Sequence, residues 1–565
     1  MLNKLVGFLQ KERSSHPLGS PQNIDQTLGE IPVGDAARVL VDIDNLLDDF
    51  SRYDTELPPD ATREALIQID TFARPFYDDL LQNYLLPGTR AHGEDLAWVT
   101  LDKHVQVLCA AYRHCLLQGS RDNDKEERTQ GQRMAMALCA ARAIDAWVEH
   151  KKLLHCRYRP ADSAWWETVH ELIGLANGLG VMRLSQTVYP EQTPARSCLH
   201  AYMAGLYFEL APVSNLIPLQ FEVLQRWLQQ HAAAFELTEV PHDASTHVLD
   251  IAMHTPPQRF DPQRPLRGTR LHYCSTRRMR GNILKLAQFT RPQATLPEWL
   301  QPFHTYNEQI TGLVELLLRH WAEQPPERSS AREAGECGLR VVSGLSLARR
   351  MIACSAYARS GRSLNYRGTE LSNLFNEYRF GRGAVANADE PPPDPMETLL
   401  RLETSGDKQM MEEWRQSDVS AQGLGATSLT LRSRNRIGEL ISYRREGEIE
   451  WCLGILRRIS RTPQRRFSYG LETLPGPAQC AQVRNPDLKL GIWAEAFEAG
   501  NGFIDAIMLA PESQELLLPT GLFSPALVLT LVVDGKQSSI TLTEIIDQGN
   551  EWERVRFQPT PQEAS

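Results

Sequence analysis

The sequence contains no CxxC pair, although it has ten cysteines. Zinc knuckles and thioredoxin-like redox sites both depend on closely spaced cysteine pairs, so neither is expected. Cysteines without such spacing are typical of reduced, mostly buried thiols in a cytosolic protein. The pattern therefore predicts a cytoplasmic protein without a cysteine-bound metal.

The N-terminal residues lack the uninterrupted apolar core of a secretory signal peptide, because Lys4, Lys11 and Arg13 interrupt them. We expect a short amphipathic helix there. Residues 516–533 carry no charge and approach the length of a membrane-spanning helix. Two prolines and a glycine break this segment, however, so strand, turn and strand is the better prediction and no membrane span is expected.

Motifs for catalysis are also missing. The sequence has no GxxxxGKS/T loop, no HExxH, no GxSxG and no GxGxxG in a suitable context. His170 and Glu171 lack the second histidine of a zinc protease, and the SxxK pair of Ser405 and Lys408 has no partner motif. We therefore predict that the chain is not an enzyme, holds no metal and needs no cofactor.

An overall excess of basic residues is absent too. The formal net charge is −10 at pH 7, which argues against a surface built for non-specific duplex binding. Two stretches depart from this balance, since residues 264–280 hold six arginines and residues 432–466 hold ten. A nucleic-acid-binding regulator is kept as an alternative, although no helix-turn-helix or base-stacking platform is recognisable. The second stretch is either a solvated face or a positive field that attracts an anionic ligand.

What is present favours an α+β multidomain chain, because 565 residues are too many for one hydrophobic core. Apolar residues recur at helical spacing before about residue 235, whereas short alternating segments and turns follow residue 418. We predict an N-terminal all-α helical domain, a mixed connector, an antiparallel β-barrel and a small C-terminal β-rich domain. The expected bounds are 1–235 for the helical domain, 236–326 for the connector with its final long helix, 327–484 for the barrel with a helical insertion at 346–412, and 485–560 for the C-terminal domain.

Two short motifs stand out about ninety residues apart. Arg328 and Arg332 form an RxxxR just before a predicted strand, and Asp418, Ser420 and Gly423 form a DxSxxG at the junction of two predicted strands. Each motif is weak by itself, because arginines are frequent in this chain and Asp, Ser and Gly are common turn residues. Their order along the chain, followed by the predicted paired strands WCLGILRR and FSYGLE, is a more specific signal than either motif.

That order resembles the PilZ domain, a small β-barrel family that binds cyclic di-GMP. The resemblance covers residues 327–345 and 414–475, and it implies that the predicted barrel is PilZ-like. It further implies that Arg328 and Arg332 grip the phosphates and stack on guanine. Asp418, Ser420 and Gly423 are then expected to hold the other base edge.

The chemistry of these residue types suits such a ligand. Arginine supplies bidentate phosphate contacts and a flat face for stacking. Aspartate accepts hydrogen bonds from guanine N–H donors, and glycine permits close backbone approach. Glu327 stands where relatives that bind a ligand dimer tend to have a basic residue, so one ligand per site is favoured. Arg457 or Arg458 could supply a further cation.

The working hypothesis is a receptor or adaptor without enzymatic activity. It binds cyclic di-GMP, and the ligand orders the RxxxR hinge against the barrel and so couples the second messenger to a protein partner through the helical domain. Nucleic acid is not expected as a partner. Three alternatives remain open: the nucleic-acid-binding regulator, a PilZ-like structural adaptor that binds no ligand, and an enzyme whose site is too dispersed to recognise in the sequence.

Overall fold

The computed structural model divides the chain into two compact units, residues 1–327 and 328–565. Each unit has its own hydrophobic core. The amphipathic helix predicted for the first residues lies outside the described part of the chain. The described residues are 21–48, 58–86, 94–121, 128–190, 194–291, 294–322, 330–360, 394–404, 410–432, 435–462, 464–485 and 502–560.

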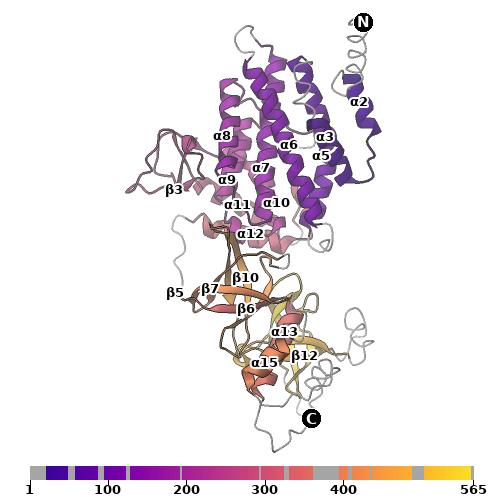
Figure 1. Cartoon of the computed structure of the whole chain (residues 1–565), viewed down its shortest axis with the longest axis vertical. Coiled ribbons are helices and arrows are strands. Elements are labelled where there is room, and N and C mark those ends of the chain that lie inside the picture. Colours follow the sequence, from indigo (N-terminus) through magenta and orange to yellow (C-terminus); the bar gives the residue numbers. More distant parts are fainter. Residues whose placement is uncertain are drawn as a thin grey trace, which may run out of the picture. The chain divides into compact units, whose positions relative to one another are not determined.

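The first unit is dominated by long helices that pack side by side, with α6 against α7, α3 and α5 (Figure 1). Its core is built from aliphatic and aromatic side chains that recur at helical spacing, as the sequence pattern predicts. The helices are α2 (Pro21–Glu30), α3 (Ala36–Asp48), α5 (Pro59–Leu85), α6 (Glu94–Arg121), α7 (Gln130–Cys156), α8 (Ser163–Gly178), α9 (Cys198–Glu209), α10 (Pro218–His231), α11 (Arg277–Phe289) and α12 (Asn307–His320).

Side chains cap the first turns of some of these helices, among them α7 and α8. The Thr129 side chain accepts from the backbone N–H of Gln132 at the start of α7, and the Gln132 side chain accepts in return. Asp162 caps α8 in the same manner, through the backbone N–H of Trp165. These side chains satisfy backbone donors that have no partner inside the helix.

A buried polar cluster ties three of the long helices together. Arg142 of α7 donates to the Asp70 carboxylate of α5 at 2.8 Å, and the Tyr112 hydroxyl of α6 donates to the same oxygen at 2.5 Å. Tyr189, from the segment before α9, donates to Asp70 at 3.2 Å. All four side chains are buried, so their mutual hydrogen bonds replace those that water would make.

Residues that follow the bundle complete the first unit. A four-stranded antiparallel sheet has the order β1-β4-β2-β3. Side chains from this sheet and from α11 and α12, including Leu249, Cys274, Ile283 and Leu313, join the same core as the bundle. The strands are β1 (Leu237–Thr238), β2 (His247–Asp250), β3 (Gln258–Arg259) and β4 (Leu271–Cys274).

The second unit begins with a closed antiparallel barrel. Strand β7 pairs with β6 on one side and with β8 on the other, which closes six strands into a ring, while β5 extends the β6 side of β7. Inside the barrel the Trp414 and Tyr469 rings stack with centroids 4.0 Å apart. The strands are β5 (Glu333–Ala334), β6 (Gly338–Ser343), β7 (Glu412–Ser420), β8 (Gly423–Ser428), β9 (Leu440–Arg445), β10 (Cys452–Arg461) and β11 (Phe467–Thr473).

A second closed barrel follows, with the strand order β12-β13-β14-β17-β16-β15. One core cluster joins both barrels to α13, and the indole N–H of Trp552 donates to the carbonyl of Gly438 at 3.1 Å. The elements are α13 (Leu345–Arg359) and α15 (Pro395–Thr404) before β7, and then β12 (Gln479–Arg484), β13 (Ile504–Met508), β14 (Glu515–Pro519), β15 (Val528–Val533), β16 (Lys536–Gln548) and β17 (Trp552–Pro559).

The predicted fold class is confirmed: an all-α domain precedes an antiparallel β-barrel and a β-rich C-terminal region. The uncharged segment 516–533 forms β14, a turn and β15, as the prolines and glycine indicate. The limit predicted at residue 484 falls at the end of β12, a strand of the second barrel. All ten cysteines are free thiols.

Candidate functional site

The two motifs singled out in the sequence meet in the second unit. Strand β5 pairs with the end of β7, so that Ala334 lies opposite Asp418. Directly before β5, the Arg332 guanidinium donates to the Asp418 carboxylate at 2.6 Å. The long segment between the two motifs therefore does not prevent contact between Arg332 and Asp418. Arg328, the other arginine of the RxxxR motif, lies outside the described residues.

A β-bulge sets the direction of the Asp418 side chain. Before the bulge, Trp414 and Gln416 are buried inside the barrel. The register then shifts, since Gln416 lies opposite Ala426 but Asp418 lies opposite Gly425, the next residue of β8. Because neighbouring residues of a strand point to opposite faces, Asp418 shares the outer face with Gly425.

Glycines form the floor beneath the charged groups. A Cβ atom on Gly425 would lie 2.5 Å from the nearer Asp418 carboxylate oxygen, so the carboxylate rests directly on this glycine. Gly470 of β11 lies opposite Gly425, and a Cβ atom there would lie 3.3 Å from the Cβ of Arg458. Arg458 in turn lies opposite Gly470 in β10. Asp418, two glycines and Arg458 thus form one row across four neighbouring strands.

Ser420 and Gly423 stand at the end of the β7–β8 hairpin. They lie opposite each other, and the Ser420 hydroxyl makes a long hydrogen bond of 3.4 Å to the Gly423 carbonyl. A Cβ atom on Gly423 would lie 3.1 Å from the carbonyl oxygen of Leu471, so the glycine permits the close approach of β11. Asp418, Ser420 and Gly423 therefore gather on one outer edge of the barrel.

The Arg332–Asp418 pair is open to solvent, with side chains 36% and 26% exposed. An ion pair at this level of exposure contributes only about 0–1 kcal/mol of stability. The other carboxylate oxygen of Asp418 accepts from the Ser417 hydroxyl at 3.2 Å. A ligand that offers an anionic acceptor to Arg332 and a hydrogen-bond donor to Asp418 can replace this contact at small cost.

The two further arginines suggested by the sequence have different surroundings. Arg457 donates to Glu472 at 2.8 Å and pairs with Asp547, a residue of β16 in the second barrel. Burial lowers the pKa of Arg457, but Asp547 and Glu472 outweigh it and raise the pKa overall. Arg457 therefore links the two barrels through its ion pairs, whereas Arg458 lies next to Gly470.

A cleft of about 680 Å³ lies along the same strands. Arg415 and Thr427, which face each other across β7 and β8, line it together with Arg466. On the outer face of the barrel, the pair of Arg415 and Thr427 is next to the pair of Asp418 and Gly425. Arg415, Gly425 and Gly470 belong to neither motif, so the sequence alone does not assign them to the site. The signal for the two glycines is their matching register on paired strands, which becomes visible only once the pairing is known.

Two negative findings apply to the described part of the chain. No group of three or more His, Cys, Asp or Glu side chains there is arranged to hold a metal ion. Within the same residues, none of the helices combines the length and the apolar character needed to cross a membrane.

Comparison with known families gives one match. Residues 22–243 match the family model described as the N-terminal domain of the cyclic-di-GMP receptor FimW. The match is a similarity to a cyclic-di-GMP receptor family, and it spans less than half of the chain. It covers much of the helical unit, whereas the barrel with the two motifs lies outside the matched residues. A search of curated proteins found no match.

Proposed function

We propose that this protein is a cyclic-di-GMP receptor that binds the dinucleotide on the outer face of its first barrel, in the manner of a PilZ domain. The observation that carries the proposal is the contact between Arg332 and Asp418, which brings the RxxxR and DxSxxG motifs together. The family match of the helical unit supports the same ligand independently.

The roles follow from the chemistry of the groups. Arg332, with Arg328, supplies charge-assisted hydrogen bonds to the two phosphates and a flat face for guanine. Asp418 accepts from the guanine N–H donors, and Ser420 adds a hydroxyl at the edge of the site. The floor of Gly425 and Gly470 leaves room for a planar base to lie close to the backbone.

Ligand binding replaces the contact between Arg332 and Asp418. That exposed pair contributes about 0–1 kcal/mol. A hydrogen bond from a charged group to the ligand contributes about 1.5–3 kcal/mol. The exchange is therefore favourable, and Arg458 and Arg415 add positive charge along the same face.

The position of the RxxxR motif suggests how binding is passed on. Arg328 is the first residue of the second compact unit. In this proposal the dinucleotide holds the segment 328–332 against the barrel, and the helical unit, engaged by a protein partner in the cytoplasm, responds to that change. The response requires that the ligand binds the closed arrangement more tightly than the open one.

Calorimetric titration of the full chain with cyclic di-GMP tests the proposal. We expect binding at micromolar concentration or tighter in the wild type. Arg332→Ala and Asp418→Ala should each weaken it by about 10- to 100-fold, because each removes a charged hydrogen-bonding group. Arg401→Ala is the matched control, since it removes an exposed, ion-paired arginine of α15 that belongs to neither motif and does not line the cleft.

Two results would overturn the proposal: no binding by the wild type, or equal binding by Asp418→Ala and Arg401→Ala. A parallel titration with duplex DNA and with RNA separates it from the nucleic-acid alternative. We expect no binding of either nucleic acid at physiological salt, given the net charge of −10.

A further inference from the structure

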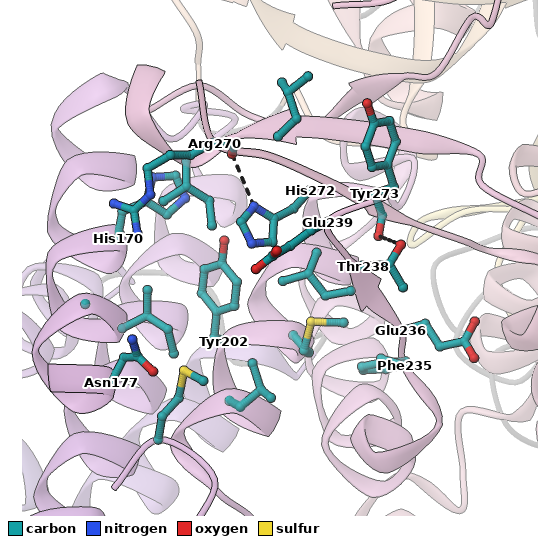
Figure 2. Close-up of a pocket in the computed structure, with 18 of the residues that line it drawn as sticks. His170, Asn177, Tyr202, Phe235, Glu236, Thr238, Glu239, Arg270, His272 and Tyr273 are labelled. Atoms are coloured by element: carbon teal, nitrogen blue, oxygen red, sulfur yellow. Dashed lines mark hydrogen bonds between the residues drawn. The ribbon is translucent and has the colours of Figure 1, made fainter. Parts of the chain in front are cut away.

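The first unit contains a cavity of about 980 Å³, distant in sequence from both motifs (Figure 2). Its walls come from α8, from α9, and from strands β1 and β4 of the small sheet. This volume lies within the range of sites for small organic ligands, about 300–1,000 Å³. No role in the proposed barrel site involves any of its residues.

A buried hydroxyl without a partner lies in the cavity wall. Tyr202 is 2% exposed, and its hydroxyl forms no hydrogen bond with any described residue. Figure 2 shows this hydroxyl pointing toward the segment that carries Arg270 and, in β4, His272. Burial raises the pKa of Tyr202, so the group stays a neutral O–H donor. A buried donor left unpaired is unfavourable, and a ligand acceptor would recover that free energy.

His170 beside it is also uncharged near neutral pH. Burial, with a contribution from His254, lowers the pKa of His170 to about 4. Its ring centroid lies 6.0 Å from that of Tyr202. The inner wall of the cavity is therefore neutral and polar, and it presents hydrogen-bonding groups without charge.

The rim of the cavity carries positive charge. Arg183 and Arg270 line it, and neither forms an ion pair with a described residue. Of the acids there, Glu236 is paired with Arg278 at 2.6 Å, which leaves Glu239 as the only lining carboxylate without a described ion-pair partner. Arg270 also belongs to the six-arginine stretch 264–280, which the barrel site leaves unexplained.

Apolar side chains cover much of the remaining wall. Ile173, Met182, Leu199 and Met203 line the cavity from α8, α9 and the segment between them. Methionine side chains adapt to irregular apolar shapes, which suits a wall that receives a ligand. The cavity thus combines an apolar wall, a neutral buried donor and a cationic rim.

We propose that this cavity is a second small-molecule site, which takes an amphipathic organic anion. The apolar body of the ligand lies on Met182, Leu199 and Met203, an acceptor atom receives the Tyr202 hydroxyl, and the anionic group reaches Arg270. The site is independent of the dinucleotide site on the barrel.

The probe for this proposal is anilinonaphthalene sulfonate, an amphipathic aromatic anion whose fluorescence rises in apolar surroundings. Gly174 lies in α8 on the cavity wall, and a Cβ atom there would meet nothing within 4 Å. Gly174→Leu should therefore narrow the cavity, and its Cβ atom clashes with no neighbour. Gly281→Leu in α11 is the matched control, because its added Cβ also meets nothing within 4 Å and it does not line the cavity.

We expect the wild-type full chain and Gly281→Leu to bind the probe alike, and Gly174→Leu to bind it about tenfold more weakly or not at all. Arg270→Gln should weaken the sulfonate probe by about tenfold, since a charge-assisted contact is lost. The same variant should leave binding of the uncharged analogue N-phenylnaphthylamine unchanged. Absence of probe binding by the wild type, or equal binding by the two leucine variants, would overturn the proposal; equal loss of both probes in Arg270→Gln would overturn the anionic class.

Discussion

At the scale of single residues, the candidate dinucleotide site depends on two glycines, which have no side chain and so leave space for charged neighbours. Gly425 leaves the space in which the Asp418 carboxylate rests, and Gly470 leaves the space beside Arg458. The sequence predicts Asp418 and Ser420 as site residues because the spacing of their motif is local, and this stays a prediction. The two glycines could not be assigned, because their role arises from register between strands that are distant in sequence.

Replacing Gly425 by alanine should displace the Asp418 carboxylate from the site although residue 418 remains an aspartate. The added Cβ would lie 2.5 Å from a carboxylate oxygen, so the carboxylate must move and its contact with Arg332 is lost. We expect Gly425→Ala to weaken cyclic di-GMP binding by about tenfold or more in calorimetry. In an Asp418→Ala background the same change should have little further effect, because the two residues act together. Fully additive losses would contradict this coupling.

Two buried histidines of the first unit should make it sensitive to acid. Burial lowers the pKa of both His170 and His247 to about 4. In the unfolded chain a histidine titrates near a pKa of about 6.5, so between these values the unfolded state binds more protons and stability falls as the pH drops.

The loss at pH 5 relative to neutral pH should be about 2 kcal/mol for each of the two histidines. Chemical unfolding of the wild type and of His170→Gln at pH 7 and pH 5 measures it. The variant should lose about 2 kcal/mol less stability than the wild type between the two pH values. An unchanged pH dependence in the variant would show that His170 is not protonated on unfolding.

At the scale of elements, strand β7 organises the barrel site. Its first half alternates between buried and exposed residues, as expected for a strand with one face in the core. The bulge after Gln416 then turns Asp418 to the outer face. Strand β5 pairs with the end of β7, and the Arg332 guanidinium directly before β5 lies 2.6 Å from the Asp418 carboxylate. The sequence predicts the strands, whereas the bulge depends on pairing with β8 and is not encoded in the local pattern.

In the helical bundle, Arg142 holds two helices together. It joins α7 to α5 through Asp70, and both side chains are almost fully buried. Removing one member of a buried ion pair leaves an uncompensated charge, so we expect Arg142→Met to destabilise the protein by about 3–5 kcal/mol. Urea unfolding of the full chain measures this effect. The double variant Arg142→Met with Asp70→Leu should recover part of the loss; a double variant less stable than the single one would contradict the explanation.

At the scale of the whole molecule, hydrophobic periodicity predicts the fold class and its order along the chain. Helical spacing before about residue 235 and alternation after residue 418 correspond to the long helices and to the strands. Closure of the C-terminal strands into a second barrel was not predicted, because closure depends on the pairing of β12 with β15, which lie far apart in sequence. The cavity of the first unit was missed for the same reason, since its walls come from α8, α9 and β4.

The central claim is that the outer face of the first barrel recognises cyclic di-GMP through a guanine-binding carboxylate. Calorimetric titration of the wild-type full chain with cyclic di-GMP, and in parallel with cyclic di-AMP, tests it most directly. Adenine lacks the N1–H group whose hydrogen bond the Asp418 carboxylate is expected to accept, so cyclic di-AMP should bind at least about tenfold more weakly. Micromolar or tighter binding of cyclic di-GMP with this preference is the predicted result; no binding of cyclic di-GMP, or equal affinity for both dinucleotides, would contradict the claim.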